Sequence, residues 1–376
     1  MTTALSSLNL RERGTTLDDR TLLRRMLEIR SLSGQERSLA EFLREEMRAR
    51  GFQARIDEAG NAVGEQGTAG SGPTIVLLGH MDTAPGEVPV RQDGDILQGR
   101  GAVDAKGPLA AFIAAATAYE GPGRVVVIGA VEEESATAKG ARHAVAQYQP
   151  DAAIIGEPSA WDRVTVGYKG RLLAEYQGRQ PSAHTAGQHP SVCDRAVRFW
   201  HRTGEAIDAV NAERASTIFD RLQGSLRTMQ STSDGLEDSA TLTMGFRLPT
   251  PFDIAAWRET LRALAGEDTL RFHAYEPAVR VDKNTPLARA MLTGIRALGG
   301  RPRYAVKTGT SDLNVVAEHW RCPLLAYGPG DASLDHTPNE HIDLKEYDKA
   351  IAILRTALAE LALTLPTRSM QLVEIG

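Results

Sequence analysis

The sequence predicts an α/β fold with a mostly parallel sheet, interrupted by an inserted α+β domain. Three apolar runs that end in turn residues indicate the sheet, namely TIVLLGH (74–80), RVVVIGAVEEE (124–134) and DAAIIGEPS (151–159). Strands that are apolar throughout and alternate with helices are typical of parallel sheets covered on both faces. A βαββαβ order of elements after residue 164 indicates the insertion, because it is the order of a ferredoxin-like sandwich. The length of 376 residues also favours two domains over a single core.

Further helices of the α/β part are predicted from the spacing of apolar residues. Residues 17–50 have helical spacing, with a break at Ser33 and Gly34. The Ala-rich segment 104–121 carries Pro108 early, where a helix tolerates it. After the insertion, two helices and a strand with its turn are expected at 285–300, 344–365 and 322–330.

The inserted part reads as strand, helix, two strands, helix and strand. The strands are expected at 163–178, 225–230, 240–249 and 269–277, and the helices at 191–210 and 253–266. Residues 1–165 and 279–376 then form the α/β domain, and residues 166–278 form the insertion. The inserted sheet has an edge that its own sequence does not cover, and exposed edges invite pairing across a two-fold axis. We therefore expect a homodimer joined through the inserted domain.

The composition excludes several classes of protein. A net charge of −5 and a pI near 6.0 argue against a nucleic-acid binder, whose domain is usually basic. The two cysteines, Cys193 and Cys322, stand in no CxxC pattern, which excludes a disulfide scaffold and thiolate zinc and fits a reducing cytoplasm. No segment has the apolar core of a signal peptide or the length to span a membrane. We expect a soluble cytoplasmic protein with no nucleic-acid or membrane partner.

Three predicted strands of the α/β part end at a side chain that can bind a metal. These side chains are His80, Glu134 and Glu157, and the carboxyl ends of parallel strands lie at one edge of a sheet. Asp104 stands just before the Ala-rich helix, and SLDHTPNEH supplies His336. Each residue alone has an ordinary explanation as a turn or surface residue, but the five together favour a metal site. One imidazole per metal with shared carboxylates suits zinc or cobalt.

Six motifs carry a resemblance to a known family. The motifs GHMDTAPG, GRGAVDAKGP, VEEESATAKGAR, GEPS, KTGTSD and YGPG with DHTPNEHI resemble, in order and spacing, the acetylornithine deacetylase/succinyl-diaminopimelate desuccinylase family of di-metal amidohydrolases. The resemblance extends from about Leu22 to Leu363. Within the family, the second, third and fifth motifs are most similar to the amino-group carrier protein–lysine hydrolases. Those enzymes release lysine or ornithine from the carrier protein LysW.

The resemblance implies a catalytic α/β domain that holds two divalent metal ions, with zinc as the expected metal and cobalt as the alternative. Asp104 would bridge the two ions. His80 and Glu157 would complete one site. Glu134 and His336 would complete the other.

The resemblance also implies roles for residues beside the ligands. Asp82 would hydrogen-bond the His80 ring and fix its tautomer, as metal-binding histidines usually require. In the glutamate triplet, alignment with the family pattern Asp-Glu-Glu makes Glu133 the general base and Glu134 the ligand. Glu132 replaces the family's aspartate, so a register shifted by one residue stays open.

Catalysis in the family uses water. Two metal ions lower the pKa of water toward about 7, and Glu133 would take its proton and later protonate the leaving amine. The family stabilises the oxyanion with a histidine from the inserted dimerisation and lid domain of the partner subunit. The segment PSAHTAGQHPSV offers His184 or His189, of which His184 matches the family position better.

Substrate binding requires a cation for the substrate's α-carboxylate. Arg247 in TMGFRLP lies where the family has a strand arginine, and a guanidinium pairs well with a carboxylate. The asparagine that often precedes this strand in the family is missing here. The loop KTGTSD is expected to hold the other end of the substrate, through Lys307, Thr308, Gly309 and Thr310.

The resemblance therefore implies a hydrolase of linear amide C–N bonds that frees lysine, and also ornithine, from LysW in lysine or arginine biosynthesis. The alternative within the class is a dipeptidase, or a deacylase acting on N-acetylornithine, N-acetyllysine or succinyl-diaminopimelate. A non-catalytic protein that binds metal or an amino acid on the same fold is a third interpretation. The presence of Glu133 disfavours it, because a degenerate member would be expected to lack the base.

Overall fold

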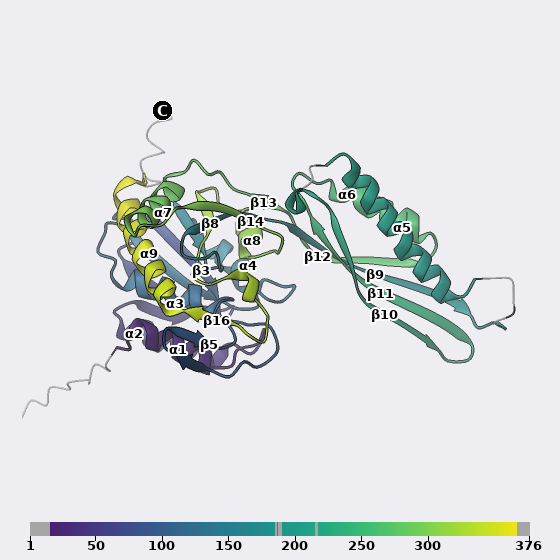
Figure 1. Cartoon of the computed structure of the whole chain (residues 1–376), viewed down its shortest axis with the longest axis horizontal. Helices are drawn as coiled ribbons and strands as arrows, with labels where there is room; N and C mark the ends of the chain where they lie inside the picture. The colour runs from purple at the N-terminus through teal and green to yellow at the C-terminus, as the bar shows by residue number, and fades with distance from the viewer. Residues whose placement is uncertain (1–15, 185, 187–189, 215–216, 367–376) are drawn as a thin grey trace, which may run out of the picture.

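Two β-sheets organise the computed structural model, which describes residues 16–184, 186, 190–214 and 217–366. A nine-stranded sheet with its helices forms the larger part, and a four-stranded sheet with two helices extends away from it (Figure 1). The chain enters the smaller part between Tyr168 and Gly170 and leaves it after Glu276. We propose that the smaller part is the inserted domain expected at 166–278, with residues 166–168 belonging instead to the larger sheet, and that the flanking segments form one α/β domain.

The larger sheet is mixed, with parallel strands at its centre. Its strands are β1 (Gln53–Ile56), β2 (Ala62–Gly67), β3 (Thr74–His80), β6 (Arg124–Ala130), β7 (Ala152–Ile155), β8 (Arg163–Tyr168), β13 (Val279–Arg280), β14 (Arg303–Lys307) and β15 (Leu324–Ala326). The order is β1-β2-β6-β3-β7-β15-β8-β13, and β14 pairs with β8. Strands β6, β3, β7 and β15 pair in parallel, whereas β1, β2 and β13 pair antiparallel. The three apolar runs predicted as strands are thus confirmed at the parallel centre.

Helices cover both faces of the larger sheet. One face packs against α1 (Asp19–Glu28), α2 (Arg37–Ala49), α3 (Lys106–Thr117), α7 (Pro286–Ala297) and α9 (Leu344–Thr364). The other face packs against α4 (Lys139–Gln147) and α8 (Asp312–Val316). Within β3, Leu77 points into the first core, and Val76 and Leu78 point into the second. Because both faces are buried, these strands are apolar throughout.

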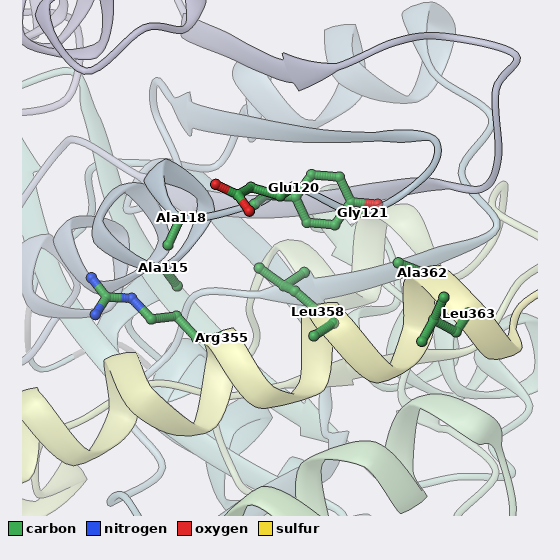
Figure 2. Close-up of a pocket in the computed structure, with 10 residues that line it drawn as sticks. Ala115, Ala118, Glu120, Gly121, Arg355, Leu358, Ala362 and Leu363 are labelled. Carbon is green, nitrogen blue, oxygen red and sulfur yellow. The ribbon is translucent and has the colours of Figure 1, made fainter.

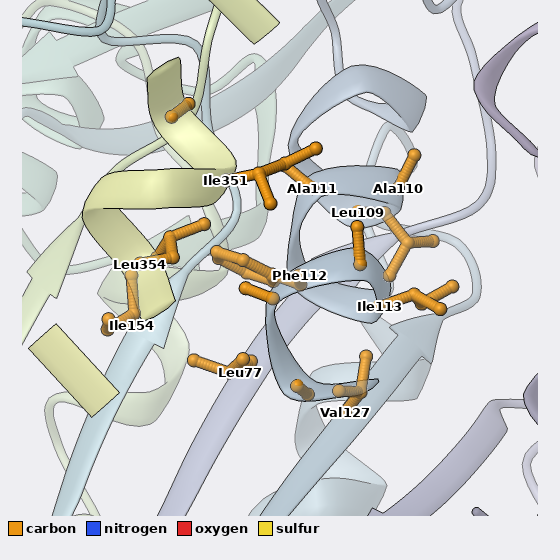
Figure 3. Packing of buried hydrophobic residues seen from close by; sticks show 14 of the residues in the cluster. Leu77, Leu109, Ala110, Ala111, Phe112, Ile113, Val127, Ile154, Ile351 and Leu354 are labelled. Atoms are coloured by element: carbon orange, nitrogen blue, oxygen red, sulfur yellow. The ribbon is translucent and has the colours of Figure 1, made fainter. Parts of the chain in front are cut away.

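Helix α3 lies between the sheet and α9 and is buried almost throughout. Its alanines and Gly79 of β3 permit a close approach, since a Cβ added at Gly79 would lie 3.2 Å from the Cβ of Leu109. The helix begins directly after Asp104, which is therefore held near the carboxyl end of β3, where His80 lies. Figure 3 shows this packing, with the labelled side chains Leu77, Leu109, Phe112, Ile113, Val127, Ile154, Ile351 and Leu354.

The smaller sheet has four antiparallel strands in the order β10-β11-β9-β12. Its elements are β9 (Gly170–Pro181), α5 (Val192–Ala212), β10 (Gln223–Ser233), β11 (Glu237–Leu248), α6 (Ile254–Ala265) and β12 (Thr269–Glu276). Their sequence confirms the predicted βαββαβ arrangement. Both helices pack on one face of the sheet. Ser191 caps the N-terminus of helix α5 and forms a capping box with Asp194.

The structure differs from the prediction of one strand over residues 163–178. That segment forms two strands, β8 in the larger sheet and β9 in the smaller one. The two segments that connect the sheets pass close to each other, since a Cβ added at Gly170 would lie 2.5 Å from the carbonyl oxygen of Glu276. Apolar periodicity continues through the crossing since both strands face a core, so the pattern alone does not reveal the change of sheet.

Smaller elements complete the described chain. A three-stranded sheet has the order β16-β5-β4, made of β4 (Arg91–Asp93), β5 (Ile96–Gln98) and β16 (His341–Asp343). Short 3-10 turns occur at Ile218–Asp220 and Ala332–Leu334. Among the residues that the structure describes, no helix is both long enough and apolar enough to cross a membrane.

Candidate active site and metal centre

Two cavities of different character are present in the molecule. One, of about 330 Å³, lies beside α3 and α9 and is lined largely by alanine and leucine side chains (Figure 2). Its arginine, Arg355, already donates to the carbonyl oxygen of Ala114 and to Asp19. The other cavity, of about 1120 Å³, is lined by residues of both sheets and contains most of the predicted site residues. We call this second cavity the intersheet cavity.

Asp104 lies between two histidines at the intersheet cavity. Its Oδ1 is 3.1 Å from Nε2 of His80, and its Oδ2 is 3.2 Å from Nε2 of His336. Nε2 of His336 is also 2.8 Å from Oε1 of Glu134. Potential ligand atoms of Asp104, Glu134 and His336 all lie within 4.8 Å of one another. A carboxylate whose two oxygens face two different imidazoles has the geometry needed to bridge two metal ions.

The main-chain carbonyl of Asp82 lies within hydrogen-bond distance of the second ring nitrogen of His80, Nδ1. Nδ1 lies 2.9 Å from the Asp82 carbonyl oxygen and 3.6 Å from its carboxylate Oδ1. With Nδ1–H donating to the carbonyl, Nε2 is left for a ligand. The Asp82 carboxylate, the expected acceptor, thus lies beside the ring but farther from Nδ1 than the carbonyl oxygen does. That carboxylate accepts hydrogen bonds from the backbone N–H groups of Glu133, at 3.1 Å, and Glu134, at 3.0 Å.

Glu133 and Glu157 complete the acidic side of the intersheet cavity. Burial raises the pKa of Glu133 well above its usual value, and the charge of Glu157 raises it further, while His80 lowers it. Burial and then the charge of Asp104 raise the pKa of Glu157 in the same way. Crowded carboxylates repel one another, and cations among them relieve that repulsion. Two imidazoles with several carboxylates therefore form a donor set that fits divalent metal ions.

The backbone beside the cavity adopts uncommon conformations. The φ angle is 59° at both Glu132 and His336, in the left-handed region. Such conformations cost about 1–3 kcal/mol each and cluster at functional sites. The carboxylate of Glu132 accepts a hydrogen bond from the hydroxyl of Thr137 at 2.6 Å. Among the described residues of the glutamate triplet, Glu133 and Glu134 line the cavity and Glu132 does not.

Basic side chains also line the intersheet cavity. Arg247 of β11 donates from Nη1 to Oγ1 of Thr310, 2.9 Å away, and so connects the smaller sheet to the loop after β14. The four predicted loop residues all line the cavity, namely Lys307, Thr308, Gly309 and Thr310. The positive charge of Lys307 acts against the rise in the pKa of Glu157. Cationic and anionic groups thus line the same cavity.

His184 lies far from the intersheet cavity of its own chain. It follows β9, which begins at the crossing to the larger sheet with Gly170 and runs for 12 residues to Pro181. A strand of that length extends for roughly 40 Å. His184 is exposed, and the cavity lining found among the described residues does not contain it. The alternative histidine, His189, lies outside the described residues.

Glu340 is a site residue that the sequence reasoning missed. Its side chain is fully buried. Oε1 accepts the backbone N–H groups of Val103, at 3.0 Å, and Asp104, at 3.1 Å. Oε2 accepts a hydrogen bond from Nη1 of Arg100 at 2.7 Å. Glu340 therefore fixes the backbone that carries Asp104. In the sequence, only its position four residues after His336 indicates that it lies near the site. Arg171 and Arg227, which the sequence did not predict as site residues, also line the cavity.

Comparisons of the sequence identify its relatives. The profile of peptidase family M20/M25/M40 matches residues 76–360. A LysW-lysine hydrolase of Deinococcus radiodurans is 49% identical over 353 residues, which cover 91% of this chain and 96% of that protein. A LysW-lysine/LysW-ornithine hydrolase of Sulfurisphaera tokodaii is 29% identical over 350 residues, covering 91% and 95%.

Solved structures show the same fold at low sequence identity. An M20 family metallo-carboxypeptidase of Sulfolobus solfataricus superposes with a TM-score of 0.75 at 18% identity and covers 93% of this chain and 100% of that one. A dinuclear metal-binding peptidase of the M20 family from Bacillus subtilis gives a TM-score of 0.65 at 16% identity, covering 92% and 98%. Since the profile match spans most of the chain, the protein belongs to peptidase family M20/M25/M40.

Proposed function

We propose that this protein is a metal-dependent amidohydrolase that cleaves the amide between lysine and the carrier protein LysW. Release of ornithine from the same carrier is included, and the free amino acid would enter lysine or arginine biosynthesis. The observation that carries the proposal is the placement of Asp104 between His80 and His336, at a cavity that Arg247 also lines. The relative named LysW-lysine hydrolase, at 49% identity, supports the choice of substrate.

The proposed site holds two divalent metal ions, zinc in the first instance and cobalt as the alternative. Asp104, His80 and Glu157 would hold one ion, and Asp104, Glu134 and His336 would hold the other. When bound, such ions polarise the amide carbonyl and make water a better nucleophile near neutral pH.

In the proposed mechanism, Glu133 moves the protons. Its burial raises its pKa, so its carboxylate accepts a proton from the attacking water more readily than an ordinary glutamate does. The same carboxyl group then protonates the nitrogen of the leaving lysine. The carboxylate of Asp82 orients Glu133, because it holds the backbone N–H groups of Glu133 and Glu134.

Arg247 binds the α-carboxylate of the amino acid in this proposal. Its guanidinium is already aimed at the cavity by the hydrogen bond to Thr310, and the fork of donors suits a carboxylate. Lys307, Thr308, Gly309 and Thr310 line the same wall and would hold the remaining part of the substrate.

We also propose a cytoplasmic homodimer joined through the smaller sheet. Its edge strand β10 is exposed along almost its whole length, and Met229 on that strand is 43% exposed. Val197 on the adjacent α5 is 54% exposed. A long edge strand beside exposed apolar side chains is suited to pairing with a second copy across a two-fold axis. His184 of one subunit would then serve the cavity of the other.

A substrate comparison tests the proposed function. Protein loaded with zinc or with cobalt is expected to release lysine from LysW-lysine with a kcat/KM roughly tenfold or more above that for Nα-acetyllysine. Free amino acid is quantified after each reaction, with chelator-treated protein as the control and LysW-ornithine as a second carrier substrate. A preference for Nα-acetyllysine would contradict the carrier proposal and favour a small-molecule deacylase. Metal binding without any amide turnover would favour a non-catalytic binding protein.

Replacing Glu340 by glutamine tests how Asp104 is held. Glutamine keeps the size of the side chain but loses the charge that faces Arg100 and the two backbone N–H groups. We expect zinc affinity to fall by about 10–100-fold, as for other residues that orient ligands. Calorimetric titration of the metal-free protein measures the change, with Glu58→Gln as the control because the Glu58 side chain is 86% exposed. A lower melting temperature with unchanged zinc affinity would restrict Glu340 to a folding role.

A further inference from the structure

Three arginines lie together on the wall of the intersheet cavity, on the face of the smaller sheet opposite α5 and α6. Arg171 of β9 and Arg247 of β11 are direct partners in the strand register. Their neighbours Leu172 and Phe246 belong to the core under the helices, so the arginines point to the other face. Arg227 of β10 lines the same cavity. Three guanidinium groups therefore belong to one wall.

A β-bulge directs Arg227 to this wall. The pairing of β10 with β11 is irregular between Leu226 and Thr228, which leaves Arg227 as an extra residue. A bulge of this kind re-aims a side chain. The side chain of Arg227 extends over Gly245 of β11, since a Cβ added there would lie 3.3 Å from Cδ of Arg227. The glycine thus leaves the space that Arg227 occupies.

The positive charge of this cluster has little compensation within the described chain. Arg247 donates to the neutral hydroxyl of Thr310, and Arg171 donates from Nε to the carbonyl oxygen of Ala274, 3.2 Å away. The carboxylate of Glu276, near Arg171, is already ion-paired with Arg142.

Arg227 is exposed, and its guanidinium forms no hydrogen bond or ion pair with another residue that the structure describes. Burial and then the like charges of Arg171 and Arg227 lower the pKa of Arg247, while the charge of Glu133 acts in the opposite direction. Such a cluster favours a bound anion.

One substrate carboxylate does not account for three arginines. In the proposed function, Arg247 takes the α-carboxylate of the released amino acid. The other charged group of lysine is its ε-ammonium, which Arg171 and Arg227 repel. The acyl part of the substrate is therefore the part that can supply a second anion to them.

We propose that Arg171 and Arg227 form a second anion subsite, which binds a carboxylate on the acyl part of the substrate. The inference rests on the proposed function in its choice of substrate. It deepens that function, because the enzyme then selects conjugates of carboxylate-bearing acyl groups over conjugates of neutral ones. Arg227 is the residue that confers this selectivity, and Arg171 assists it from the neighbouring position on the wall.

Two matched ligands test the subsite. Nα-glutaryl-lysine carries a terminal carboxylate on its acyl chain, and Nα-pentanoyl-lysine ends in a methyl group at the same chain length. Binding is measured by calorimetry in the metal-loaded Glu133→Ala protein, so that no turnover is needed. We expect the glutaryl compound to bind roughly 10–100-fold more tightly than the pentanoyl compound, as for hydrogen bonds between charged groups. In Arg227→Gln this ratio should fall at least tenfold, and in Arg171→Gln it should also fall.

The matched control is Arg271→Gln. Arg271 is an exposed arginine of β12 in the same sheet and is not part of the described cavity lining, so its replacement should leave the ratio unchanged. Equal binding of both ligands, no binding of either, or a ratio that Arg227→Gln leaves unchanged would overturn the subsite. A ratio that depends on Arg227, together with failure of wild-type protein to hydrolyse LysW-lysine, would keep the subsite and reject the proposed function.

Discussion

Replacing Glu133 by alanine is expected to lower kcat by about 10²–10⁴-fold while both metal sites stay occupied. Glu133 lines the cavity, and its carboxyl group has a pKa raised by burial, as suits a group that takes and returns a proton. Turnover of LysW-lysine and metal content per subunit, measured on the same preparation, check the result.

Glu134→Ala is the matched control, because it removes the adjacent carboxylate of the same loop. Oε1 of Glu134 lies 2.8 Å from Nε2 of His336, so its loss should lower metal occupancy at one of the two sites. The carboxylate of Glu132 is turned toward Thr137, which supports this register of the triplet. Metal loss in Glu133→Ala with full occupancy in Glu134→Ala would show that the register is wrong by one residue.

The candidate metal centre was predictable because its geometry follows from topology. His80 stands at the end of β3, and Glu134 and Glu157 follow β6 and β7, the two strands that flank β3 in parallel. The carboxyl ends of such strands meet at one edge, so residues distant in sequence converge there. The apolar runs of the strands predict the sheet, and the sheet in turn predicts the cluster.

Contacts that depend on exact backbone geometry were not predictable. Arg227 reaches the cavity through a bulge, and a strand pattern does not show where an extra residue is inserted. Glu340 acts through hydrogen bonds to the backbone of Val103 and Asp104, which leave no side-chain pattern in the sequence. Asp82 stands two residues after His80, yet its carbonyl oxygen is the closer acceptor, because its carboxylate holds the glutamate loop. Spacing alone identifies neighbours but not which atoms meet.

His184→Ala is expected to lower kcat by about 10²–10³-fold with unchanged metal content, the usual cost of losing one oxyanion donor. The structure makes this residue remote from its own cavity, because the 12-residue strand β9 separates it from the crossing at Gly170. A role in catalysis then requires that it act on a second subunit, which the exposed edge strand β10 is suited to bring close. The kinetic loss alone would not show which subunit supplies the histidine.

Mixing two inactive variants identifies that subunit. A dimer of one His184→Ala subunit and one Glu133→Ala subunit has one cavity with intact Glu133 and the partner's intact histidine. Random exchange of equal amounts should restore about one quarter of the wild-type activity. A mixture of Glu133→Ala with Glu134→Ala is the matched control and should stay inactive, because both residues belong to the cavity of one chain. If the first mixture also stayed inactive after subunit exchange had been demonstrated by mass, His184 would not act on the partner's cavity.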